Sequence, residues 1–378
     1  MPPTVQLQGF HEEHGHLTEF AGFRLPLWFT GIIPESLAVR EAAGIFDVSH
    51  MGRSIIKGDD SERFLQQITS NDVSTLKEGQ GQYSLLCNPE GGIKDDLLVL
   101  KLRKDKYSIV YNAANRSSDY EWFKTNKEGF DVEIEDLSNE SAMFAVQGPR
   151  AVPLVTEAAH DSRLAGVPRF SFDWAKIGSV PVLLSRTGYT GEDGFEVFVW
   201  DSPIDHPDNA KIVWDELLRV GKPMNLQLCG LGARDLLRLE AGLCLYGIDI
   251  DEKTTPFEAR LGFVVKLQKD FIGSSKLREA KENCPTKLRV GLVTQKRVIP
   301  RHGFTITDNG REIGVVTSGT LSPIIKTGIA MGYVEEQDAK DGSLVDMRFR
   351  DRYEAAKITR PPFYDTTKYG YSRKLHQS

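Results

Sequence analysis

The stretch from Lys287 onward places the strongest constraint on the fold, because one strand pattern follows another there. Apolar and polar residues alternate, as at Leu288, Val290 and Leu292, and Asn309-Gly310 favours a two-residue hairpin turn. The segments with a strand pattern are 288–292, 304–306, 313–316, 329–334 and 344–349. A charged helical pattern over 274–281 ends just before Glu282-Asn283-Cys284-Pro285. We therefore predict a separate β-barrel-like domain over 285–378.

The part of the chain before this stretch mixes helical and strand patterns. Proline in a first turn and Gly44 after the last apolar residue predict a helix over 34–43. An acidic turn before Phe64, Leu65 and Ile68 predicts a second helix. Short apolar segments bounded by turn residues predict strands at 97–102, 108–111, 142–146, 180–185 and 194–200. The expected fold class is therefore α+β.

Composition narrows the class of protein. With 378 residues, 40% hydrophobic and 26% charged, the chain is typical of a globular protein of two or three domains. Its net charge of −6 argues against a nucleic-acid partner. Four scattered cysteines without a C-x-x-C pair argue against a zinc ribbon or a disulfide scaffold. There is no basic, apolar leader and no apolar run of about 18 residues, so we expect a cytoplasmic protein without membrane contact.

Two adjacent carboxylates, Asp95 and Asp96, follow the turn Gly91-Gly92 at the mouth of the strand predicted at 97–102. Because side chains alternate along a strand, only one of the pair can point inward. Spacing alone leaves a second interpretation open, in which the pair forms a solvated acidic turn.

A second segment, 186–196, holds three glycines and three acidic residues in eleven positions. Glycine allows a ligand or another backbone to approach closely. A buried Glu196 between Phe195 and Val197 would need hydrogen-bond donors. These could be the amino and ring N–H groups of a pterin or guanine, or an arginine of the chain itself.

A third segment, 230–242, places Arg234 and Arg238 on one helix face. Two such arginines fit either recognition of an anion or an internal ion-pair hub. A dinucleotide fingerprint is excluded, because Asp235 stands where the third glycine would be and no strand is expected before Gly230.

No metal site is predicted. The histidines of His11-Glu12-Glu13-His14 are three residues apart instead of four, and Gly15 interrupts any helix. A P-loop and a G-x-S-x-G elbow are also absent from the sequence.

Several short strings occur in an order and spacing that are informative together. They are FDVSHMG at 46–52, GGIKDD at 91–96, VQGP at 146–149, GYTGEDG at 188–194, LGARD at 231–235, LCLYG at 243–247, TPFE at 255–258 and TSGTLSP at 317–323. Over essentially the whole chain they resemble the aminomethyltransferase family, the T-proteins of the glycine cleavage system. One departure is FAGF at 20–23, where the family usually has FAGW.

The resemblance implies a fold of three domains in a cloverleaf-like arrangement around a central hole that binds tetrahydrofolate. The last domain of this fold is a β-barrel. The division that we expect is 1–54 with 140–245, then 55–139 with 246–283, and finally 285–378.

The resemblance also implies a reaction. The one-carbon unit of an aminomethyl group on the dihydrolipoyl arm of an H-protein passes to tetrahydrofolate, and ammonia is released. Such a transfer needs no metal and no protein nucleophile, but it needs orientation and stabilisation of cationic character, which suits a carboxylate. Two alternatives are open: a folate-dependent demethylase of sulfonium or methoxy compounds on the same scaffold, and a methanopterin in place of folate. An oligonucleotide-binding role of the barrel is disfavoured by the acidic balance of the chain.

The same resemblance assigns roles to residues. Asp96 matches the catalytic position, whereas Asp95 on the other face is expected to be structural or solvated. The pterin would pack against Met51 and Tyr83, with Tyr189 in the same pocket. The remaining pocket positions are Glu196, which would accept the pterin amino and amide N–H groups, Asn112 and Arg234.

The H-protein is expected to be a transient partner. Because H-proteins are generally acidic, a locally basic rim should receive it. The candidate basic residues are Lys287, Arg289, Lys296, Arg297, Arg301, Arg348, Arg350 and Arg352.

Overall fold

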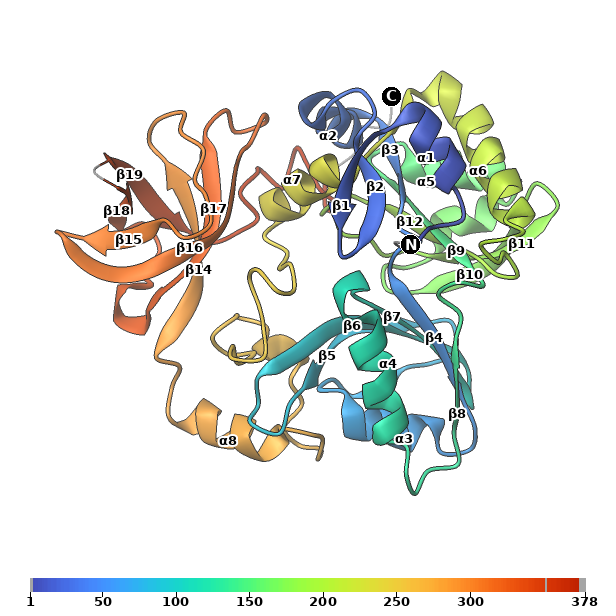
Figure 1. The fold of residues 1–378 in the computed structure, drawn as a ribbon, viewed down its shortest axis with the longest axis horizontal. Coiled ribbons are helices and arrows are strands. Elements are labelled where there is room, and N and C mark those ends of the chain that lie inside the picture. Colours follow the sequence, from blue (N-terminus) through green and yellow to red (C-terminus); the bar gives the residue numbers. More distant parts are fainter. Residues whose placement is uncertain (1–2, 351, 374–378) are drawn as a thin grey trace.

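The computed structural model describes residues 3–350 and 352–373, which form three lobes (Figure 1). Two lobes are built on open sheets covered by helices, and the third is a closed barrel. A small hairpin of β1 (His16–Phe20) and β2 (Phe23–Trp28) lies beside the first lobe, after the short helix α1 (Gln8–His14). Among the described residues no helix is long and apolar enough to cross a membrane.

The first lobe contains a six-stranded sheet of order β10-β11-β12-β9-β3-β13. Its strands are β3 (Ala43–Asp47), β9 (Ala142–Gln147), β10 (Phe172–Ile177), β11 (Val180–Ser185), β12 (Gly194–Val199) and β13 (Leu226–Leu228). Helices α5 (Ala151–Ala158) and α6 (Asp208–Gly221) cover one face, where Phe144 and Trp214 are buried. On the other side lie α2 (Ile32–Glu41) and α7 (Leu231–Ala241), which pack against each other.

The second lobe contains a five-stranded antiparallel sheet of order β5-β6-β7-β4-β8. Its strands are β4 (Gly52–Lys57), β5 (Gly81–Cys87), β6 (Ile93–Arg103), β7 (Lys106–Tyr111) and β8 (Glu133–Asp136). Helices α3 (Ser61–Ile68) and α4 (Arg116–Thr125) contribute Phe64 and Phe123 to the core on one face. The segment leading to α8 (Ser274–Glu282) packs against Leu85 and Ile93, so a late part of the chain completes this lobe.

The third lobe confirms the predicted barrel. Its strands are β14 (Lys287–Thr294), β15 (Thr305–Asp308), β16 (Arg311–Leu321), β17 (Gly328–Glu335), β18 (Leu344–Phe349) and β19 (Arg352–Thr359). They close in the order β14-β17-β16-β15-β18-β19. Asn309 and Gly310 join β15 to β16 with φ of 49° and 84°, the positive values that a two-residue hairpin turn requires. Helix α7 packs against β16 and β17 and so lies between the barrel and the first lobe (Figure 1).

Three local expectations differ from the structure. Helix α2 ends at Glu41, and Gly44 lies inside β3, where a Cβ would come 2.4 Å from Val39 Cγ2. Gly44 therefore permits a close helix-to-strand approach and does not cap the helix. Strand β6 begins at Ile93, so the two carboxylates lie within the strand and not before its mouth. The short strand β13 does precede Gly230, contrary to expectation, although the third glycine of the fingerprint is still missing.

The segment after β19 returns from the barrel to the first lobe. There the Gly370 N–H donates to Glu192 Oε1 at 3.0 Å, and the Tyr371 N–H donates to the carbonyl of Gly191 at 3.0 Å. Arg373 also bonds to the Glu192 carboxylate. We call residues 360–373 the tail. It holds the glycine-rich segment between β11 and β12 from outside.

Candidate functional site

The centre of the candidate site is the carboxylate of Asp96 on β6. Its Oδ2 accepts a hydrogen bond from the Tyr83 hydroxyl, with 2.9 Å between the two oxygens. Its Oδ1 accepts a hydrogen bond from Asn112 Nδ2, with 2.8 Å between nitrogen and oxygen. Tyr83 lies diagonally across the sheet, because Leu85 of β5 is the partner of Asp96. Asn112 directly follows β7, whose last residue pairs with Leu97. Three neighbouring strands therefore fix one carboxylate from two sides.

The surroundings of Asp96 weaken its acidity. Burial raises the pKa of Asp96, the charge of Asp95 raises it further, and the result is a pKa of about 7. The hydrogen bonds from Tyr83 and Asn112 oppose this shift. The group can thus change its charge near neutral pH.

Asp95 points to the other face of β6 and is fully buried. It accepts the Asn112 backbone N–H at 3.0 Å and Asn112 Nδ2 at 2.8 Å. Burial raises the pKa of Asp95. The interpretation of this pair as a solvated turn is therefore wrong. One amide, that of Asn112, bridges both carboxyl groups.

Tyr189 and Arg234 form a second part of the site. The guanidinium carbon of Arg234 lies 4.7 Å from the centroid of the Tyr189 ring, a cation–π arrangement. The Tyr189 hydroxyl donates to the carbonyl oxygen of Cys244. Burial raises the pKa of Tyr189 and the nearby charge of Asp96 adds to this, so ring and carboxylate are neighbours.

Glu196 lies on β12 and is only 8% exposed. The Thr187 hydroxyl donates to its Oε2, and burial raises the pKa of Glu196. Among the described residues no arginine or lysine forms an ion pair with it, although Arg234 is close enough to favour its charged form. The arginine partner that the sequence left open is therefore not found at contact distance, and the carboxylate keeps capacity to accept further N–H groups.

The two arginines of α7 have different environments. Arg238 bonds to Asp235 at 2.8 Å, to Asp249 at 2.5 Å and to the hydroxyl of Ser318 in the barrel at 2.9 Å. The interpretation as an ion-pair hub is thus correct for Arg238. Arg234 stacks on Tyr189 instead.

Met51 and Tyr83 pack in different apolar clusters. Met51 precedes β4 and packs in the apolar cluster that contains Leu183 and Leu237, while Arg53 Nη1 donates to its carbonyl at 2.7 Å. Tyr83 packs in another cluster, with Cys244. Their shared place in a pterin pocket therefore stays a prediction.

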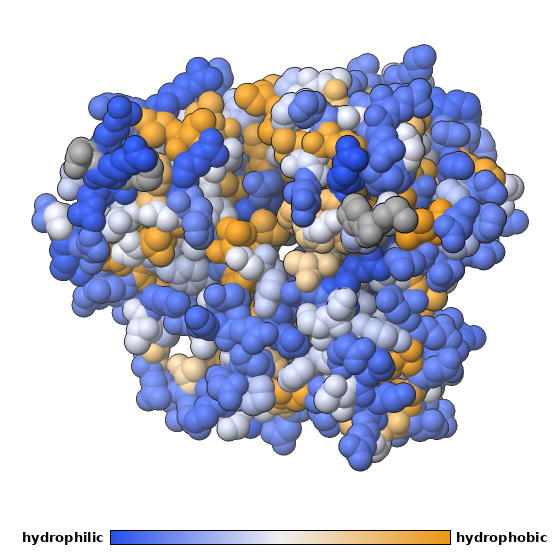
Figure 2. Space-filling view, in the orientation of Figure 1, coloured by the Kyte–Doolittle hydropathy of each residue, from blue (hydrophilic) through white to orange (hydrophobic). Residues whose placement is uncertain are grey.

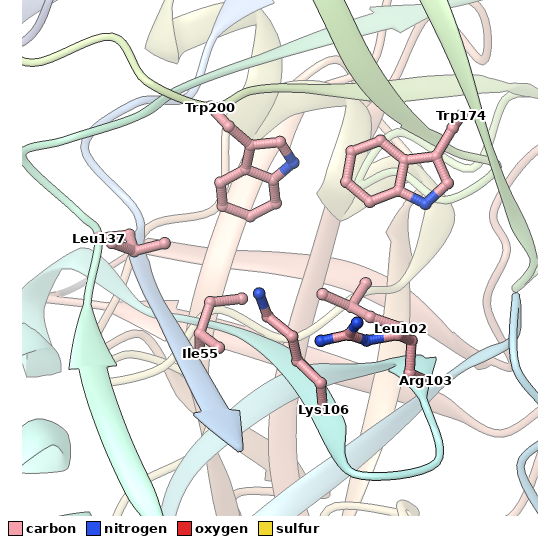
Figure 3. A pocket seen from close by; sticks show the side chains of 7 residues that line it. All are labelled: Ile55, Leu102, Arg103, Lys106, Leu137, Trp174 and Trp200. Carbon is pink, nitrogen blue, oxygen red and sulfur yellow. The ribbon is translucent and has the colours of Figure 1, made fainter.

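Figure 2 shows the surface hollowed where the three lobes meet. A separate pocket of about 430 Å³ lies between the first two sheets (Figure 3). It is lined by Ile55, Leu102, Arg103, Lys106, Leu137, Trp174 and Trp200. None of the predicted site residues lines it. Among the described residues no group of three metal-ligating side chains could hold an ion.

Sequence reasoning missed two groups that lie beside the site residues. The Cys244 carbonyl is a backbone group, which no residue pattern identifies. Asp119 is a fully buried carboxyl on α4, in the neighbourhood of Asp95. Its position four residues before the buried Phe123 marks the inner helix face, and this was the available signal.

Comparisons with known proteins cover nearly the whole chain. The family model described as the GCVT N-terminal domain matches residues 7–269, and that of the glycine cleavage T-protein C-terminal barrel domain matches residues 287–365. The aminomethyltransferase of Bacillus subtilis is 41% identical over 94% of this chain and 97% of its own length. The aminomethyltransferase of Bacteroides thetaiotaomicron is 43% identical, over 94% of this chain and 98% of its own. The crystal structure of glycine cleavage system aminomethyltransferase T from Bartonella henselae has a TM-score of 0.87 and 34% identity, and it covers 98% of this chain and 99% of its own.

Proposed function

The chain belongs to the glycine cleavage T-protein family of aminomethyltransferases, and from that premise we propose how its site acts and on which molecules. The acceptor of the one-carbon unit is tetrahydrofolate. The donor is the aminomethyl group on the dihydrolipoyl arm of an H-protein. Ammonia and methylenetetrahydrofolate are the products, and the arm is left in its dihydro form.

The observation that carries this proposal is the preorganised Asp96 carboxylate. Its two donors, Tyr83 and Asn112, hold it in place before any substrate arrives. Two folate N–H nitrogens form bonds to the aminomethyl carbon while its bonds to the amino nitrogen and to the lipoyl sulfur break, and the two folate protons leave on ammonia and on the thiol. Positive charge develops on that carbon as ammonia leaves. A fixed anion in a buried setting stabilises that charge without reorganising. Aminomethyl transfer, and not the demethylation considered as the alternative, is the activity of the curated relatives.

Glu196 is proposed to bind the pterin edge. Its buried carboxyl group has one donor at Oε2, the Thr187 hydroxyl; burial raises the pKa of Glu196, and this hydrogen bond and the charge of Arg234 oppose that shift. The amino and amide N–H groups of a pterin would supply the missing donors. Met51 and Tyr83 would pack against the ring, with Tyr189, held by Cys244, lining the same pocket. Arg234 would keep the Tyr189 ring in position and balance the charge of Glu196.

The partner protein is proposed to touch a basic part of the barrel. Lys296, Arg297 and Arg301 are exposed and support this proposal. Arg289 does not belong to such a surface, because its guanidinium donates to the carbonyls of Gly242 and Ala259, both at 2.9 Å. Arg348 is engaged with Glu312. The three-domain division that the family resemblance implies and a cytoplasmic location are also part of the proposal.

A reconstituted assay tests the proposed function. Lipoylated H-protein, glycine decarboxylase, glycine and tetrahydrofolate are combined with the protein, and methylenetetrahydrofolate is followed. We expect formation that requires all components. Loaded H-protein that accumulates without product would refute the proposal. Parallel reactions with tetrahydromethanopterin as acceptor, and with sulfonium or methoxy compounds as donors, test the two alternatives.

A further inference from the structure

Asp119 is a carboxyl that the proposed chemistry does not use. It lies in the first turn of α4 and is fully buried, and the two oxygens of its carboxyl group receive no hydrogen bond from an N–H or O–H group of the described residues. Its close polar neighbour is the carboxyl of Asp95. A buried charge without a donor is expensive, so this side chain calls for an explanation.

The neighbours form a chain of contacts that ends at the reacting centre. Asp119 adjoins Asp95, Asp95 accepts both N–H groups of Asn112, and Asn112 Nδ2 reaches Asp96. Three carboxyl groups thus share a buried region. All three cannot be ionised together, because each charge raises the cost of the next.

The surrounding charges do not neutralise this group. The charge of Lys94 acts on Asp119, but the Lys94 ammonium also lies 3.7 Å from Glu252 and 5.2 Å from the centroid of the Trp122 ring. Tyr246 faces the same carboxyls from the loop after α7 and is uncharged at neutral pH, since burial and these acids raise its pKa. The first turn of α4 favours a negative charge. None of its N–H groups reaches the carboxyl oxygens, however.

We propose that Asp119 is a positioning residue of the active site: it stays protonated, donates its O–H to Asp95, and so keeps Asp95 as the anion that holds Asn112 against Asp96. The proton remains on Asp119 throughout, so no net transfer occurs. Burial, followed by the charge of Asp95, raises the pKa of Asp119, in keeping with a neutral acid. The effect on catalysis rests on the proposed function, whereas the protonation state does not.

Two substitutions separate positioning from packing. Asp119→Asn keeps the shape, has no charge and can donate to Asp95, so we expect turnover within about threefold of the wild type. Asp119→Leu fills the space without a donor. It should lower kcat about tenfold and leave the KM for tetrahydrofolate within about twofold, because Asn112 is no longer held by a charged acceptor. A protonated Asp95 would also stop raising the pKa of Asp96, so the acidic limb of the rate profile should move to lower pH.

Equal losses in both variants, or an unchanged rate and pH profile in Asp119→Leu, would overturn the proposal. Infrared difference spectroscopy of wild type against Asp119→Asn at pH 8 decides the protonation state without any activity. We expect the difference to show a protonated carboxylic acid in the wild type, and a carboxylate there would equally overturn the proposal. Glu121→Gln on the exposed face of the same helix is the matched control. Its infrared difference spectrum against the wild type should contain the bands of a lost carboxylate and none of a protonated carboxylic acid. The infrared result stands even if Asp119→Leu fails to fold, or if the reconstituted assay shows no aminomethyl transfer.

Discussion

Replacing Asp96 by asparagine tests the catalytic assignment most directly. The substitution keeps the shape of the side chain, and both hydrogen bonds can survive. The amide oxygen can still accept Asn112 Nδ2, and the amide nitrogen can donate to the Tyr83 oxygen, since a hydroxyl both donates and accepts. The protein should therefore fold, and the loss of charge should be the main change.

The magnitude follows from the site. Removal of a preorganised group that stabilises developing charge costs about 3–4 kcal/mol, or roughly 10²–10³ in kcat. The pKa of Asp96 is about 7. About nine tenths of the wild type is therefore charged at pH 8, and about one tenth at pH 6. The ratio of wild-type to Asp96→Asn turnover should accordingly shrink about tenfold between these two pH values.

The assay is steady-state methylenetetrahydrofolate formation with saturating lipoylated H-protein at pH 6, 7 and 8. Asp95→Asn is the matched control. This substitution places an amide N–H group next to the two Asn112 N–H groups that donate to Asp95. The free energy of unfolding should therefore fall by about 1–3 kcal/mol, while turnover should fall less than in Asp96→Asn. Our reasoning would be refuted if a folded Asp95→Asn variant lost more turnover than Asp96→Asn. It would also be refuted if the ratio of wild-type to Asp96→Asn turnover did not change with pH.

Three further outcomes are expected. Glu196→Gln should weaken tetrahydrofolate binding by about 1–3 kcal/mol in titration calorimetry, because one acceptor becomes a donor; unchanged affinity would remove Glu196 from the pterin site. The folded-state pKa of Asp96 lies above the ordinary 3.8, so the wild type should lose stability as pH rises from about 4 through 7. Asp96→Asn should lack this loss and melt at a higher temperature at pH 8, a gain that should vanish at pH 4. Reversal of Lys296 and Arg297 to glutamate should raise the KM for H-protein and weaken its salt dependence, with turnover of free aminomethyl-dihydrolipoamide unchanged. Lys127→Glu on another lobe is the control, and an equal loss with both substrates would point to a folding effect.

Local patterns predicted the barrel well, because alternation and a hairpin turn are properties of a few consecutive residues. The turn at Asn309-Gly310 and strand β18 occur where the sequence indicates. The opposite faces of Asp95 and Asp96 likewise follow from the period of a strand. Gly44 shows the limit of such patterns. A glycine after an apolar run has the same appearance whether it ends a helix or lets Val39 pack against β3.

Local sequence patterns do not predict which distant residues a side chain contacts. Arg234 and Arg238 lie one turn apart on the same helix, and the sequence does not distinguish them. Arg234 nevertheless stacks on Tyr189, whereas Arg238 binds Asp249 and the barrel residue Ser318. Which element docks at each end of α7 depends on contacts between residues distant in sequence. The same holds for Asp119, because its role depends on α4 packing against the strand that carries Asp95.

The tail gives the three lobes the character of a closed ring. The barrel is joined covalently to the second lobe at one end, and the tail ties its other end to the first lobe through Glu192 and the backbone of Gly191. Each contact between lobes therefore forms at a high effective concentration, as within a cyclised chain. If one junction between lobes opens while the other two hold, the chain gains little conformational entropy. We expect the lobes to melt in a single calorimetric transition, and removal of residues 365–373 to divide it into separate steps.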